Sequence, residues 1–129
     1  MTDRETAYLI RAMVSRGVVS KSDDSQETQT VDVAQWAGVE RTAVEVMQPF
    51  GIASRAPANG LVLLLAVGGD QGDLVALPVG APGSRLGNLA EGEVALYTTD
   101  GSRVLIRADG AIEVTSSQSV DVKVPGKAR

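Results

Sequence analysis

The chain has 129 residues, 43% of them hydrophobic and 22% charged, a composition typical of one small globular domain or of a small domain with an appendage. Sixteen acidic residues outnumber twelve basic ones, and the net charge of −4 has the wrong sign for a protein that binds nucleic acid electrostatically. The sequence has no histidine and no cysteine, which excludes Ser–His and Cys–His catalytic pairs, disulfides and iron–sulfur sites.

The N-terminal segment, residues 1–17, predicts a helix. Thr2 and Glu5 have the spacing of a capping box, in which each side chain satisfies a free backbone N–H group. Gly17 is the predicted stop of the helix. The apolar stripe between cap and stop consists of Leu9, Ile10, Met13 and Val14.

No targeting segment is expected. Acidic residues stand among the first five, where a secretory signal carries basic ones. The longest apolar run, residues 61–67, is far shorter than the roughly 20 residues that cross a bilayer. We therefore expect a soluble chain that is synthesised in the cytoplasm.

A small barrel of the OB type is predicted over residues 18–91. Turn residues separate short runs that have the apolar character or the alternation of strands, and five such strands with little helix are typical of this barrel. Val31 and Val33 are expected to share one face of their strand, and Val44 and Val46 are expected to point inward. The five runs are residues 18–19, 29–33, 43–47, 61–67 and 74–79.

Beyond a Gly/Pro-rich stretch at 78–87, a predicted hinge, the sequence changes character. Residues 92–125 read as four short strands, with turns at 100–101, 109–110 and 116–119. Nine apolar residues of these strands carry even numbers, with Ala95, Tyr97 and Leu105 as the odd-numbered exceptions, so turns of even length would keep the nine on one face. They are Val94, Leu96, Val104, Ile106, Ile112, Val114, Val120, Val122 and Val124.

These even-numbered residues need a partner layer, because one thin sheet with one apolar face is not stable alone. The last three strands repeat every eight residues, as in a β-solenoid or a stacked β-prism. Two partners remain open: the chain's own barrel, or identical copies in a ring that closes at three and places the apolar side chains on a common axis. The exposed stripe and the repeat favour homo-oligomerisation.

No residue constellation indicates an enzyme. The run Gly68–Gly72 lacks the Lys and Ser/Thr of a phosphate-binding loop and precedes a strand, which favours a hairpin turn. Asp70 and Asp73 are too few ligands for a calcium loop and are interpreted as solvated turn acids. Trp36 is one of only four aromatic residues, so a packing role is favoured over a base-stacking one.

Several runs in this order resemble the phage Mu-type baseplate assembly protein family, whose members form the central, membrane-piercing spike of contractile tails. The resemblance spans roughly residues 5–115. The runs that carry it are residues 48–54 (QPFGIAS), 57–60 (PANG), 67–73 (VGGDQGD), 89–97 (LAEGEVALY), 100–101 and 107–110.

The resemblance implies an all-β homotrimer with an OB-fold barrel after a short N-terminal helix, followed by an intertwined β-helix or β-prism spike over residues 92–129. It implies a place in the virion tail baseplate, with hub proteins at the tail-tube end and the host outer membrane as a transient partner. From the composition and the missing residue constellation we also expect no enzyme activity and no nucleic-acid partner. The nine even-numbered residues would form the trimer core.

One departure from the family concerns the apex, where members commonly carry a His-any-His motif from which three chains hold an iron ion. This sequence has no histidine, so no metal site and no cofactor is carried over. Two interpretations stay open: a short, blunt needle capped by a separate tip protein, or a truncated chain.

Two other functions compete with the spike. An OB-fold module that binds nucleic acid or a glycan is the alternative, and it predicts ligand-dependent changes on the barrel face. A peptidoglycan-cleaving enzyme is the least favoured, because 129 residues leave no room for a lysozyme domain beside barrel and needle.

Overall fold

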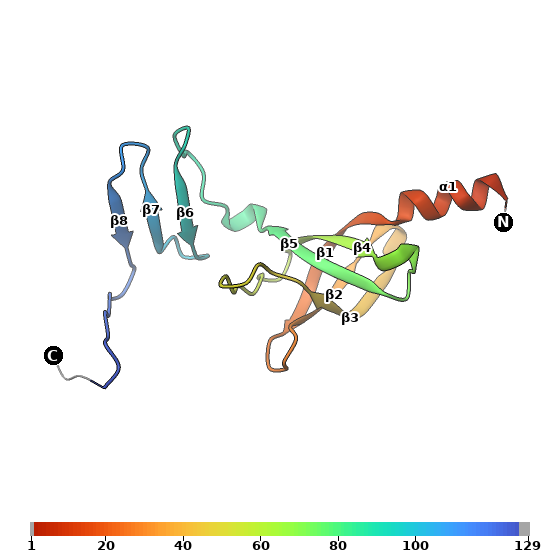
Figure 1. Ribbon diagram of the computed structural model, residues 1–129, viewed down its shortest axis with the longest axis horizontal. Helices are drawn as coiled ribbons and strands as arrows, with labels where there is room; N and C mark the ends of the chain where they lie inside the picture. The colour runs from red at the N-terminus through yellow and green to blue at the C-terminus, as the bar shows by residue number, and fades with distance from the viewer. Residues whose placement is uncertain (1, 127–129) are drawn as a thin grey trace. The chain divides into compact units, whose positions relative to one another are not determined.

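The computed structural model describes residues 2–126 and is mostly β (Figure 1). It comprises an N-terminal helix, a five-stranded mixed barrel and a three-stranded antiparallel sheet. The chain divides into two compact units, Met1–Pro82 and Gly83–Arg129. The division falls inside the Gly/Pro-rich stretch at 78–87, and each unit is described by itself below.

The first unit is a closed barrel with the strand order β1-β2-β3-β5-β4. All neighbouring strands are antiparallel except β3 and β5, which are parallel, and the pairing of β1 with β4 closes the barrel. The prediction of five strands is therefore confirmed. Their bounds are β1 (Val14–Asp23), β2 (Thr30–Ala34), β3 (Glu40–Val46), β4 (Leu61–Ala66) and β5 (Leu74–Gly80), with short 3₁₀ turns η1 (Trp36–Gly38), η2 (Val67–Gly69) and η3 (Pro82–Ser84).

The barrel core is aliphatic. Burial alternates along β2 and β4, because successive side chains of a strand point to opposite faces. The predictions that residues 31 and 33 share a face and that residues 44 and 46 point inward are confirmed. The core consists of Val19, Val31, Val33, Val44, Val46, Val62, Leu64 and Ala76.

Helix α1 (Asp3–Ala12) begins as predicted, since the Thr2 Oγ1 accepts a hydrogen bond of 3.1 Å from the Glu5 N–H. It ends at Ala12 rather than at Gly17. Val14 already belongs to β1, where it pairs with Leu65. Gly17 is a buried strand residue, and a Cβ there would lie 3.1 Å from the Leu64 Cδ1. The glycine thus allows close packing across the barrel. In the sequence alone, a glycine with this role looks the same as one that ends a helix.

The second unit contains β6 (Val94–Tyr97), β7 (Arg103–Ile106) and β8 (Ile112–Thr115) in one antiparallel sheet. The expectation of four strands is wrong for this chain: residues 120–124, although described, form no strand. The two hairpins each turn through an Asp-Gly pair whose glycine has a φ near +90°, at Gly101 and Gly110. The third predicted turn, Ser-Ser-Gln-Ser at 116–119, has no glycine to take that conformation.

Candidate assembly surface

The register of the second unit places the even-numbered apolar residues of β6, β7 and β8 on one face. Val94 lies opposite Ile106, and Ile106 lies opposite Ile112 on the other side of β7. The remaining cross-strand pairs are Leu96 with Val104 and Val104 with Val114. We call this set of six residues the even face. Cross-strand aliphatic pairs of this kind stabilise a sheet, and here they also build a continuous apolar surface.

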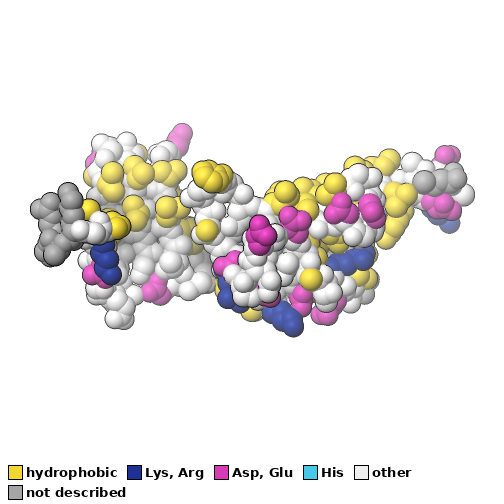
Figure 2. All heavy atoms as spheres, turned by 60° about the horizontal axis from the view of Figure 1, so that its bottom comes forward, with side chains coloured by type: hydrophobic (Ala, Val, Ile, Leu, Met, Phe, Trp, Pro, Cys, Tyr) yellow, Lys and Arg dark blue, Asp and Glu magenta, His cyan; other side chains and the backbone are white. Residues whose placement is uncertain are grey.

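The even face is exposed to solvent in the single chain. The exposed fraction of its side chains runs from 39% at Val104 to 68% at Leu96. Figure 2 shows hydrophobic side chains gathered in rows on the C-terminal unit. Contiguous exposed apolar surface on a small protein marks an interaction site, so this face is the candidate functional site.

The other three predicted core residues lie in the C-terminal segment, residues 116–126. Val120, Val122 and Val124 are 59%, 90% and 53% exposed, and none of them is paired in a sheet. The structure therefore brings six of the nine predicted residues together on the even face. It leaves these three outside any sheet.

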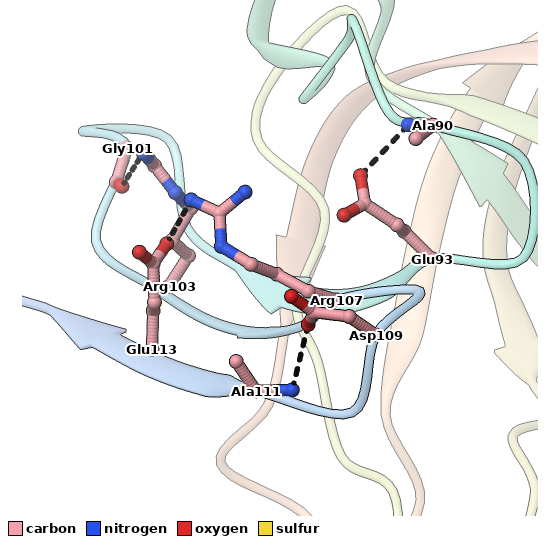
Figure 3. Close-up of polar contacts among 8 residues, drawn as sticks. All are labelled: Ala90, Glu93, Gly101, Arg103, Arg107, Asp109, Ala111 and Glu113. Atoms are coloured by element: carbon pink, nitrogen blue, oxygen red, sulfur yellow. Dashed lines mark hydrogen bonds and ion pairs between the residues drawn. The ribbon is translucent and has the colours of Figure 1, made fainter.

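The opposite, odd-numbered face of the same sheet carries paired polar side chains (Figure 3), although Ala95, Tyr97 and Leu105 also lie on it. The Arg107 Nη2 lies 2.6 Å from the Glu113 Oε2, and the Arg103 Nη1 donates a hydrogen bond of 3.2 Å to the Gly101 carbonyl oxygen. The bond with Glu113 raises the pKa of Arg107. Leu105, only 7% exposed, is the one apolar strand residue on this face that is buried. The polar side chains of the odd face thus have partners within the chain, whereas the residues of the even face stay 39–68% exposed.

A second polar cluster fixes the point at which the chain leaves β8. The Asp100 carboxylate accepts hydrogen bonds from the Thr98 hydroxyl, from the Ser102 N–H at 3.0 Å and from the Ser117 Oγ at 2.6 Å. The Ser117 N–H also donates to the Ser102 Oγ at 3.2 Å. The bond from Ser117, together with those from Thr98 and Ser102, holds the pKa of Asp100 far below its usual range. The cluster ties the β6–β7 turn to the first residues of the C-terminal segment.

The residues considered for other chemistry occupy turns. Gly68–Gly72 connects β4 and β5, which confirms the predicted hairpin turn, and Asp70 accepts a hydrogen bond of 2.8 Å from the Gly72 N–H. Within the described part of the chain, no three His, Cys, Asp or Glu side chains are grouped as metal ligands would be. Trp36 is 38% exposed at the start of η1, so it packs only in part.

Phe50, whose prominence was not predicted, is fully exposed in the loop between β3 and β4. The signal was present in the sequence. A lone aromatic residue between Pro49 and Gly51 stands at the centre of a tight turn, where a side chain points outward.

A known protein family matches the part of the chain that forms the barrel. The family described as "Bacteriophage Mu Gp45, N-terminal" matches residues 16–83, which is more than half of the chain and includes all five barrel strands except the first two residues of β1. The chain belongs to the bacteriophage Mu Gp45 family. The resemblance found from the sequence runs is thereby confirmed.

One curated member of the Mu Gp45 family is similar over nearly the whole chain. The "Baseplate puncturing device gp45" of Escherichia phage Mu is 27% identical over 123 residues, which cover 90% of this chain. The chain spans 62% of the length of that relative. The described residues contain no helix with the length and apolar character that a membrane span requires.

Proposed function

We propose that this member of the Mu Gp45 family is the central spike of a contractile-tail baseplate in a phage or a phage-tail-like particle. Three copies form a needle that caps the tail tube and pierces the envelope of the host cell. Its role is structural and not catalytic. The observation that carries the proposal is the exposed apolar even face of the sheet. The polar side chains Arg107 and Glu113 on the other face already pair with each other. The name of the phage Mu relative, a baseplate puncturing device, supports the same role.

The energetics favour assembly of the even face with copies of itself. Burying a Val, Leu or Ile side chain completely contributes about 1.5–3 kcal/mol. The nine predicted core residues are between 39% and 90% exposed, so each chain leaves on the order of 10 kcal/mol of hydrophobic stabilisation unused in water. Such a deficit is comparable to the whole stability of a small domain, which is why the proposal requires a partner layer.

A ring of three copies uses both faces of the sheet. The even faces meet on the common axis, and the polar faces with Arg107 and Glu113 turn toward water. In such a prism the backbone hydrogen bonds and the shared axial core bear an axial load together. A spike driven forward by a contracting sheath requires this resistance to unfolding.

The barrel is proposed to be of the OB type and to form the collar of the spike at the tail-tube end. Its strand order 1-2-3-5-4, closed by β1 and β4, supports that assignment. Baseplate hub proteins are the partners proposed for this end. A separate tip protein and, transiently, the host outer membrane are the partners proposed for the other end.

An OB-fold module that binds nucleic acid is less well supported by the grooves of the barrel. A groove of about 380 Å³ is lined in part by Asp24, Glu27 and Glu45. Three carboxylates in one groove repel a phosphate backbone. Strong binding to single-stranded DNA at physiological salt would nevertheless favour that module over the spike.

The decisive experiment is the mass of the purified full chain in solution. Sedimentation velocity and native mass spectrometry should give three times the mass of one chain. A stable monomer at micromolar concentration would contradict the proposal. The needle role is tested separately by whether antibodies against the chain label the distal end of the baseplate in electron micrographs.

A further inference from the structure

The loop between β3 and β4 presents Phe50 on a tight turn. The exposed fraction of this side chain is 106%, so the ring touches nothing else in the chain. Gly51 has a φ of 88°, and the Ile52 N–H donates a hydrogen bond of 3.2 Å to the Pro49 carbonyl oxygen. The ring is therefore held outward by the turn itself.

Side-chain hydrogen bonds brace both ends of this turn. The Gln48 Nε2 donates to the Ser54 carbonyl oxygen at 2.7 Å, and the Ser54 N–H donates back to the Gln48 Oε1 at 3.1 Å. The Gln29 Nε2 reaches the same carbonyl at 3.0 Å. Because this bracket closes the loop at residues 48 and 54, it limits the positions that the ring can sample.

A second brace joins the loop to the end of strand β1. The Arg55 Nε donates to the Ser22 Oγ at 2.7 Å, and its Nη2 donates to the Ser22 carbonyl oxygen at 2.9 Å. Because the loop backbone that carries Phe50 is braced in this way, docking of the ring would cost little loop entropy. That is the property of an interface anchor.

We propose that Phe50 is an anchor between barrels, docking on a neighbouring copy of this chain. The inference rests on the proposed homotrimer and adds a second contact to it, on the barrel. Met47 and Ile52, which are 51% and 56% exposed, extend the apolar surface around the ring. We call Met47, Phe50 and Ile52 the loop knob.

The buried area of the proposed trimer supports a second copy as the occupant. From the exposure of the nine predicted core residues we expect about 400 Å² of apolar surface per chain. Homo-oligomer interfaces are about 65% apolar, so this surface supports roughly 600 Å² per chain, which is short of the about 800 Å² of a standard interface. A buried Phe adds about 150–250 Å², which brings the interface to about that value.

The covalent link between barrel and sheet also supports a neighbouring copy as the docking partner of Phe50. Residues 81–93 link β5 to β6, so three sheets joined on one axis hold three barrels at an effective concentration on the order of millimolar. A neighbouring barrel is then the surface that Phe50 encounters most often. A partner from solution would have to compete with that concentration.

The test uses the fact that Phe50 is the only phenylalanine in the sequence. Full chain labelled with 4-fluorophenylalanine gives a single fluorine resonance, which reports on this ring alone. Relaxation by a soluble paramagnetic agent should fall severalfold in the trimer relative to the Ile112→Asp chain, whose assembly is disrupted. Sedimentation of the same labelled samples establishes their oligomeric state.

The outcomes separate the two proposals. A trimeric sample in which the ring stays as accessible as in the monomer overturns the docking on a neighbouring copy while leaving the spike intact. Such a ring would be free for another protein. A monomeric wild-type sample overturns both proposals.

Variants give an independent measurement. Phe50→Ala should lower the trimer association constant by about a thousandfold, tenfold for each of three contacts. Gln48→Ala keeps the ring but removes the bracket, so it should weaken assembly by less. Val67→Ala, an exposed position at the other end of β4, is the matched control and should leave the constant unchanged. An unchanged constant for Phe50→Ala would also overturn the inference.

Discussion

Replacing Ile112 by aspartate tests the even face directly. Ile112 lies on β8, the outer strand of the sheet, and is 65% exposed in the single chain. A charge at this position is therefore solvated as long as the chain is alone, and the sheet itself should tolerate it. In the proposed trimer the same position faces the axis, where three carboxylates would meet without partners.

The expected loss in the free energy of trimer association has two contributions. Each chain loses about 1.5 kcal/mol of hydrophobic burial, because about two thirds of the Ile112 side chain remains to be covered by assembly. Each buried and unpaired carboxylate adds a penalty of several kcal/mol. Summed over three chains, the loss is on the order of 10 kcal/mol, or about seven powers of ten in the association constant.

Sedimentation velocity across a range of micromolar concentrations measures this effect. Wild type should sediment as a trimer and Ile112→Asp as a monomer with an unchanged barrel. Thr115→Asp is the matched control, since it adds the same charge to the same strand but on the odd face, opposite Arg103. Trimers that survive Ile112→Asp, or that are lost equally with Thr115→Asp, would refute the assignment of the even face to the axis.

Three further predictions concern the folded chain. Gly17→Ala should lower the free energy of unfolding by about 1–2 kcal/mol in urea titrations, because its Cβ would crowd three core side chains, whereas Gly83→Ala, with nothing within 4 Å, should not lower it. Asp100, whose pKa is depressed, stabilises the fold above its unfolded pKa near 3.9 and loses this effect as the pH falls below it, so Asp100→Asn should weaken the acid-induced shift of the Ser117 amide resonance. The double change Gln118→Asp with Ser119→Gly should create a third hairpin turn, and the amides of the last predicted strand should then gain protection from hydrogen exchange; unchanged exchange would contradict the turn argument.

The sequence predicted the barrel well because its signals are local. Alternating valines at 31 and 33 and at 44 and 46 can be read without knowing their neighbours, and they define the inward face of two strands. The end of the helix was not predictable in the same way. Whether Gly17 stops a helix or makes room for Leu64 depends on a contact between residues 47 positions apart, which no local pattern encodes.

The candidate site shows the same division. The even numbering of its apolar residues was readable in the sequence, and the register of β6, β7 and β8 confirms that six of them share a face. The exposure of these residues could not be predicted from the sequence. An apolar stripe has the same sequence pattern whether the barrel of the same chain or a second chain covers it. The prominence of Phe50 depends on the braced loop, and that bracing comes from residues of three separate segments.

The C-terminal segment, residues 116–126, has a strand pattern but forms no strand within the single chain. It continues the eight-residue repeat with Val120 and Val122, yet its turn has no glycine with which to fold back on β8. The cluster around Asp100 nevertheless fixes where the segment begins, through Ser117. The segment is thus fixed at its start but has no hairpin turn with which to return to β8. This favours pairing with a strand of another chain over pairing with β8 of the same chain. This expectation agrees with the assembly proposed for the even face, and it was reached from turn chemistry rather than from hydrophobicity.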